Sequence, residues 1–172
     1  MTTRQDFPQA DLLDLLRQVR QTAAMPDGLS LAPLWAQHHT DSSAEAGSWR
    51  LSQAGEWLLQ LLTAKQALAQ AAFDTELAAD ELRRYQKFAK PGQPSAHIVQ
   101  LRQKQAAARQ ASNIARQAFL KAAAQLVREL ALDVTPRMAL EAFALHWIDN
   151  DLRKSLKPPA RGFDPPIVDK IG

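Results

Sequence analysis

Apolar residues recur at helical spacing along most of this chain, and the pattern predicts a protein built from α-helices. Between Pro8 and about Thr22, leucine and valine residues follow one another at steps of three and four, which places them on one face of a first helix. The turn sequence from Met25 to Gly28 (MPDG) ends this helix. Ser30 is then expected to cap a second, short helix that carries Leu34 and Trp35.

The region from His38 to Leu59 is the least regular part of the pattern. His38 and His39 lie at the expected end of the short helix, and Thr40 to Ser48 is polar enough for an exposed loop. WRLSQAGEWLL, from Trp49 to Leu59, resembles the segment of winged-helix regulators in which the last wing strand turns, through a capping serine, into a helix. A complete winged helix needs three helices, and only two are predicted upstream.

We favour a different interpretation of the same segment. Ser52 is expected to cap the N-terminus of a long helix, with Trp49 and Trp57 packed into the core. From Ser52 the helical pattern continues until Pro91-Gly92, which no helix crosses without breaking.

A second long helix is predicted immediately after this break. Ser95 caps it, and its apolar positions step by three and four to about Leu130, as in the seam of a coiled coil. Two long helices joined by a short turn lie antiparallel, so residues 52–131 are predicted to form a coiled-coil-like helical hairpin with an alanine-rich seam.

The C-terminal part combines one further helix with a proline-rich segment. Thr135-Pro136 is a helix-start signal, so a helix is predicted over 136–156, with Trp147 buried against the N-terminal helices. Residues 157–172 contain four prolines and are predicted to be an extended tail that packs on the bundle or on a protein partner. The expected fold is therefore all-α and a single domain, with residues 1–51 as N-terminal helices and loop.

Composition and charge narrow the functional classes. The chain has no cysteine and no apolar N-terminal run of signal-peptide or membrane-span length, so we expect a soluble cytoplasmic protein without a membrane partner. Leu82 to Arg128 contains ten Lys or Arg residues and no Asp or Glu, whereas residues 1–81 carry a net charge of −6 and residues 129–172 a net charge of −1. A cationic segment of this kind indicates a polyanionic partner.

The basic residues are arranged with a period that suits nucleic-acid binding. Arg-Gln recurs every seven residues in the second hairpin helix, so three arginines form a row on one face, about 21 Å long. A cationic row binds phosphates, and exposed aromatic rings near the hairpin turn offer stacking surfaces for bases. The candidate DNA- or RNA-binding residues are Arg83, Arg84, Tyr85, Lys87, Phe88, Lys90, Arg102, Lys104, Arg109, Arg116 and Lys121.

Two alternatives to nucleic acid follow from the same charges. Asp74, Glu76, Asp80 and Glu81 lie on the partner helix of the hairpin, so the basic row could face acids within the molecule or in a neighbouring one. A coiled-coil adaptor, scaffold or chaperone that binds an acidic protein, or self-association through the hairpin and tail, would use the same surface.

Catalytic, cofactor and metal signatures are not recognisable in the sequence. It contains no glycine-rich phosphate loop, no His-Glu-x-x-His pair and no Gly-x-Ser-x-Gly elbow. His38-His39 lacks further ligands at a suitable spacing, and His146 beside Trp147 is more typical of a structural histidine than of a general base. We therefore predict a non-enzymatic accessory protein that binds DNA or RNA within a larger assembly, without a cofactor or metal.

Overall fold

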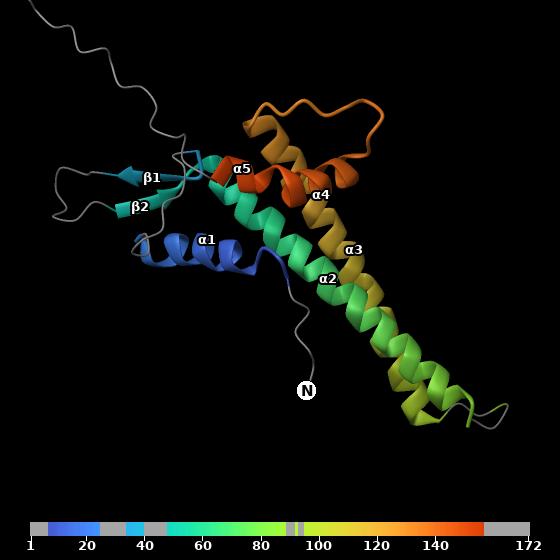
Figure 1. Ribbon diagram of the computed structural model, residues 1–172. Coiled ribbons are helices and arrows are strands. Elements are labelled where there is room, and N and C mark those ends of the chain that lie inside the picture. The colour runs from blue at the N-terminus through green and yellow to red at the C-terminus, as the bar shows by residue number, and fades with distance from the viewer. Residues whose placement is uncertain (1–6, 25–33, 40–47, 89–91, 93–94, 157–172) are drawn as a thin grey trace, which may run out of the picture.

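The computed structural model describes residues 7–24, 34–39, 48–88, 92 and 95–156, and these residues are mostly helical. Helices α2 (Gln53–Gln86) and α3 (Ala96–Glu129) pack along each other as the antiparallel hairpin that the sequence predicts. The hairpin projects from a compact end of the molecule, where the shorter elements gather around the beginning of α2 and the end of α3 (Figure 1). Those shorter elements are α1 (Ala10–Thr22), β1 (Ala36–His39), β2 (Ser48–Leu51), α4 (Leu140–Asn150) and α5 (Leu152–Leu156).

Both hairpin helices begin at the serine caps predicted from sequence. The hydroxyl oxygen of Ser52 accepts a hydrogen bond from the backbone N–H of Gly55 at 3.0 Å. The hydroxyl oxygen of Ser95 accepts one from the backbone N–H of Ile98 at 3.4 Å. Each bond satisfies an amide that has no partner inside its helix, so both helix starts are fixed by local chemistry.

The hydrophobic core lies at the compact end and draws residues from every helix there. The prediction that Trp147 is buried is confirmed, and its ring lies 6.2 Å from that of Trp35, tilted by 56°. Trp49 and Trp57 pack against this core as partly buried residues. The largest side chains that are fully buried in the described structure are Leu13, Leu16, Val19, Trp35, Leu58, Leu61, Leu62, Phe119, Leu126, Ile148 and Leu152.

The prediction of a second helix around Trp35 is wrong for the residues that the structure describes. Ala36 to His39 form strand β1, which pairs antiparallel with Ser48 to Leu51 of β2, and the register places His38 opposite Trp49. Residues 25–33, which include the expected cap Ser30, lie outside the described residues. β2 joins α2 through Ser52, whose backbone N–H donates to the carbonyl of Trp35 just before β1, so the ladder holds β1 beside the start of α2.

The helix predicted over 136–156 starts later than expected and is broken. Thr135-Pro136 forms a turn, closed by the backbone N–H of Met138 donating to the carbonyl of Thr135 at 2.9 Å, and α4 begins at Leu140. A further turn at Asp151 separates α4 from α5. Leu132 and Leu140 both pack against the core, so tertiary contacts at the two ends of this connection override the local helix-start signal.

Two further expectations concern the C-terminal tail and membrane-spanning helices. The proline-rich tail, residues 157–172, lies outside the described residues. No described helix combines the length and the apolar character that crossing a bilayer requires.

Gly55 marks the closest approach between the sheet and the hairpin. A Cβ atom at this position would lie 2.1 Å from the carbonyl oxygen of Trp35, a distance that backbone movement alone could relieve. The same carbonyl accepts a hydrogen bond from the backbone N–H of Ser52 at 3.0 Å, and the Ser52 hydroxyl also bonds to the carbonyl of Leu34. The direction in which α2 leaves the core is therefore set by backbone contacts that only glycine permits.

Gly55→Ala is expected to destabilise the protein by about 1–3 kcal/mol, the usual penalty for inserting a methyl group into a packed site. In an ordinary helix the same change is stabilising by about 1 kcal/mol, so the sign of the effect is diagnostic. Chemical denaturation of Gly55→Ala measures it, with Gln60→Ala at an exposed position of α2 as the control. An unchanged or raised free energy of unfolding would show that the two backbones are not in contact.

Trp147→Ala is expected to lower the free energy of unfolding by about 3–5 kcal/mol, because a large buried ring leaves a cavity. The variant should also lose a blue-shifted component of tryptophan fluorescence. Trp147→Phe keeps an aromatic ring in the core and should lose less stability, which separates packing from a general intolerance of the site. A variant that unfolds like the wild type would place α4 at the periphery.

Candidate nucleic-acid interface

The predicted arginine row lies on α3, which is continuous over its whole length. Arg102, Arg109 and Arg116 are all exposed, and consecutive members are about 10.5 Å apart along the helix axis. We call the side of the hairpin that they occupy the arginine face. The sequence thus placed these three side chains correctly relative to one another.

The arginine face is opposite a groove that runs between the two helices. Asp74 and Glu81 of α2 line this groove together with Lys104 of α3. Residues two positions apart in a helix point about 200° from one another, so Ala72 and Ala79 lie on the other edge of α2, beside the arginines. The side of α2 beside the arginines therefore carries Ala72, Glu76 and Ala79.

The intramolecular acidic row that sequence left as an alternative does not cover these two arginines. Neither Arg102 nor Arg109 forms an ion pair with another described residue. Glu76, which projects from the same side of α2 as Ala72 and Ala79, is also without an ion pair among the described residues. Two guanidinium groups on this face are consequently available to an external anion.

Arg116, the third member of the row, is already engaged. Its guanidinium donates two hydrogen bonds to the same carboxylate oxygen of Glu141, at 2.6 and 2.9 Å, and this contact ties α3 to α4. A paired arginine of this kind holds two elements together and is poorly placed to bind phosphate. Sequence did not indicate this partner, because Glu141 is 25 residues away and belongs to a separate helix.

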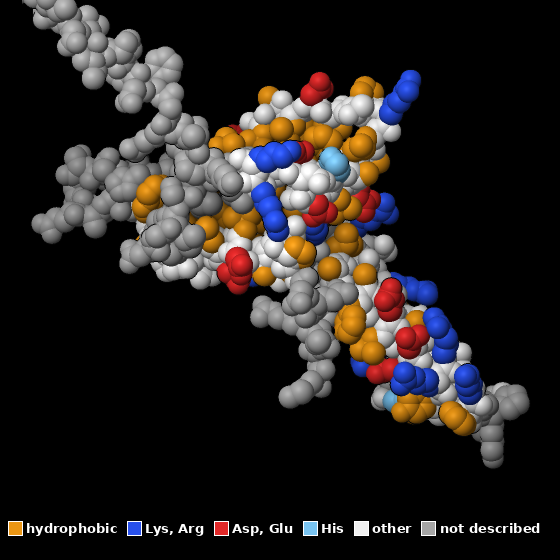
Figure 2. Space-filling model, viewed as in Figure 1, with side chains coloured by type: hydrophobic (Ala, Val, Ile, Leu, Met, Phe, Trp, Pro, Cys, Tyr) orange, Lys and Arg blue, Asp and Glu red, His pale blue; other side chains and the backbone are white. Residues whose placement is uncertain are grey.

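Charges that are segregated in sequence are mixed in space. Lys104 lies 3.9 Å from Glu81 across the groove, and Arg83 lies 3.1 Å from Asp80 on its own helix. The outer half of the hairpin, residues 71–115, contains seven Lys or Arg and four Asp or Glu, a net charge of +3. Acidic and basic side chains accordingly lie beside one another on the face seen in Figure 2.

The tip of the hairpin brings the two predicted aromatic residues together with basic ones. Phe88 is 86% exposed, the highest value among the large apolar residues of the described structure, and Tyr85 is 49% exposed. The Tyr85 ring meets His97 of α3 edge-on, with the ring centroids 4.2 Å apart. Arg84 and Lys87 are exposed beside them and make no ion pair with a described residue. His97 was missing from the candidate residues.

The remaining candidates lie apart from both groups. Lys121 is five residues beyond Arg116, about 140° around the helix, so it is exposed but outside the row. Lys90 lies outside the described residues. The structure therefore divides the candidates into an arginine face, a basic and aromatic tip, and side chains that belong to neither.

The acidic and histidine residues of α4 and of the turn at Asp151 have structural partners. Asp149 accepts hydrogen bonds from Lys65 at 2.7 Å and from Gln9 at 3.1 Å, which joins three elements of the core. His146 Nδ1 lies 3.1 Å from the side-chain nitrogen of Asn150. A hydrogen bond from Lys154 holds the pKa of Asp151 below its ordinary value. No cluster of three or more potential metal ligands occurs among the described residues.

Comparisons of the chain with protein-family models, with curated proteins and with solved structures each found no match. The case for a function consequently depends on the chemistry of the hairpin alone.

Proposed function

We propose that this protein binds DNA or RNA without catalysing a reaction, using the arginine face and the tip of the hairpin as a cytoplasmic accessory to a larger assembly. The observation that carries the proposal is the position of Arg102 and Arg109. Both project from one continuous helix, on the side of the hairpin opposite the groove, and neither has an ion-pair partner among the described residues. Each can bind a phosphate without first breaking an internal contact.

The spacing of the cations around these arginines favours, as the ligand, a long polyanion whose charges are regularly spaced. The two guanidinium groups are about 10.5 Å apart along α3, and Arg84 and Lys87 add exposed cations near the tip of the hairpin. A single small anion would contact only one of these groups. A nucleic-acid backbone, which carries a phosphate at every nucleotide, could contact several of them together.

Replacing Arg102 and Arg109 together by glutamine is expected to weaken binding and to reduce its dependence on salt. Each lost phosphate contact on duplex DNA changes the slope of log affinity against log salt by about 0.9, so the double variant should lower the slope by roughly 1.8. Glutamine is close to arginine in helix propensity, so α3 should be preserved. Fluorescence anisotropy with labelled duplex DNA, single-stranded DNA and RNA across a salt series measures both quantities.

Two single variants serve as controls for this experiment. Arg128→Gln removes the same charge from an exposed position at the other end of α3 and should leave the slope nearly unchanged. Arg116→Gln breaks the pair with Glu141 and should reduce stability more than binding. No binding by the wild type at about 50 mM salt, where phosphate contacts are strong, would end the proposal and favour an adaptor for an acidic protein.

The exposed aromatic tip predicts a preference for unpaired bases. Stacking on an aromatic ring contributes about 1–3 kcal/mol per base, and bases in a duplex are already stacked on their neighbours. Phe88→Ala should therefore weaken binding to single strands by roughly 5- to 150-fold and have little effect on duplex binding. Val99→Ala, at another exposed apolar position of the hairpin, is the control. Equal losses on both ligands would show that Phe88 does not stack on bases.

A further inference from the structure

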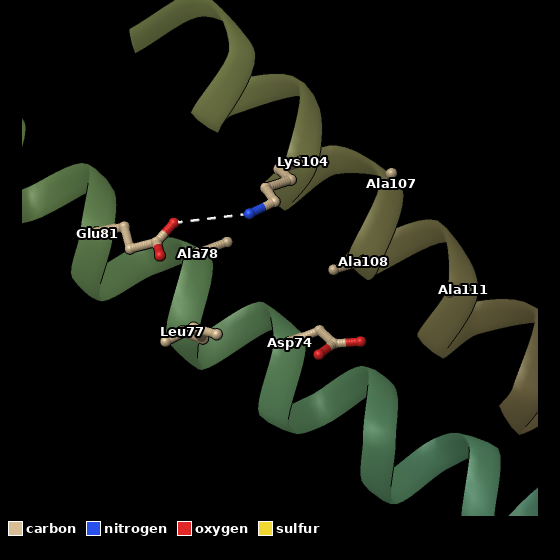
Figure 3. Close-up of a pocket in the computed structure, with 8 residues that line it drawn as sticks. All are labelled: Asp74, Leu77, Ala78, Glu81, Lys104, Ala107, Ala108 and Ala111. Carbon is tan, nitrogen blue, oxygen red and sulfur yellow. Dashed lines mark ion pairs between the residues drawn. The ribbon is translucent and has the colours of Figure 1, made fainter. Parts of the chain in front are cut away.

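The groove face of the hairpin, opposite the arginine face, has no covering element in the described structure. Its groove has a volume of about 420 Å³, and its floor is formed by Ala78 and Ala108. Figure 3 shows the ion pair between Glu81 and Lys104 bridging one end, with only methyl groups from α3 beyond it. A second hollow of about 380 Å³ begins at the same ion pair and reaches Tyr85 and His97 at the tip.

Large, exposed apolar side chains lie along this groove. Leu77, which lines it, is 43% exposed, and Ile114 on α3 is 60% exposed. Ile114 follows Ala107 and Ala111 at steps of four and three, so these residues share one stripe on the groove side of α3. The groove face thus carries both large, projecting apolar side chains and small alanine side chains.

At the compact end, Arg17 and Arg20 of α1 contact Gln66 and Glu56 of α2, but from Ala67 to the tip the core elements leave the groove face open. The two ion pairs that join α4 to the hairpin among the described residues, Glu141 with Arg116 and Asp149 with Lys65, are on the opposite side. On the groove side of α2, Thr63, Ala67 and Gln70 are all exposed, although they lie next to the compact end. A partner that lies on the groove face between Ala67 and the tip would therefore displace no described part of the molecule.

We propose that the groove face binds the groove face of a second copy of this chain, related by a two-fold axis parallel to the hairpin. Under this rotation α2 of each copy lies on α3 of the other, and residues keep their height along the axis. Glu81 and Lys104 lie level with each other, so Glu81 would meet Lys104 of the second copy. Leu77 would meet the small residues Ala107 and Ala111 of the second copy, which fits large side chains to small ones.

The charges of the groove face select this axis over the alternative. A two-fold axis perpendicular to the hairpin would place α2 on α2, with the two tips pointing in opposite directions. If that pairing were centred on Leu77, Asp74 of each copy would lie against Glu81 of the other, and adjacent like charges oppose association. The parallel axis instead places Glu81 against a lysine. Because the contact is isologous, each dimer contains this favourable pair twice.

Sedimentation velocity of the full chain, at protein concentrations on the order of 1–100 μM, tests the proposal. The wild type should show a concentration-dependent monomer–dimer equilibrium. Glu81→Lys places two cations together and should raise the dimer dissociation constant about tenfold or more, since the altered pair occurs twice. Lys104→Glu should act in the same direction. The double variant Glu81→Lys with Lys104→Glu exchanges the charges and should restore association.

A matched control and a second kind of variant complete the test. Glu76→Lys makes the same charge change five residues earlier on α2, on the side away from the groove, and should leave the dissociation constant unchanged. Leu77→Arg and Ile114→Arg alter side chains that are exposed in the monomer, so both should fold, as circular dichroism can verify, and should remain monomeric.

The results that overturn the proposal are distinct from one another. A wild type that is monomeric throughout the concentration range would exclude the dimer and favour a different protein as the partner of the groove face. Stronger association of Glu81→Lys would show that the axis is perpendicular to the hairpin. Dimers that survive both arginine substitutions would place the interface elsewhere. Because Arg102 and Arg109 lie on the other face, loss of nucleic-acid binding would not affect any of these outcomes.

Discussion

The close packing of α2 against α3 is the constraint on which the rest of this structure depends. Beyond the compact end, the hairpin is only two helices thick and buries little more than one seam, in which Ala71, Ala78 and Ala115 allow the helices to approach closely. A pair of helices that shares one seam must expose two faces. The arginine face and the groove face are therefore consequences of the same packing, and each combines side chains from helices that are far apart in sequence.

Sequence predicted the hairpin because the signals that define it are local. Ser52 and Ser95 cap the helices that follow them, and Pro91-Gly92 excludes a continuous helix. The strand from Ala36 to His39 was missed for the opposite reason. Four residues with the sequence AQHH carry no strand pattern, and their conformation depends on pairing with β2, which begins nine residues later.

The sequence predicted where the basic residues of the candidate interface lie along α3. It did not predict which of them are free of ion pairs. A period of seven was sufficient to place Arg102, Arg109 and Arg116 on one face. Which of them is free depends on a contact between α3 and α4, whose start was itself misplaced by the Thr135-Pro136 signal. The sequence did suggest that acids of the first hairpin helix could face the basic helix, but it did not indicate that Glu81 would lie beside Lys104 while Arg102 and Arg109 stay without an ion pair, because that depends on how the two helices pack.

The two faces impose different geometric requirements on any assembly that uses both. In a dimer formed through the groove faces, the arginine faces point outward on opposite sides, so a straight nucleic acid could follow only one of them. The axis proposed here keeps both tips at the same end of the dimer, so the exposed Phe88 side chains and the neighbouring basic residues of the two copies would lie at one end of the assembly. A single strand that contacts both copies would therefore have to pass across the tips. In such a dimer, the exposed aromatic residues of the two tips would contact adjacent parts of one strand, an arrangement that two independent monomers would not provide.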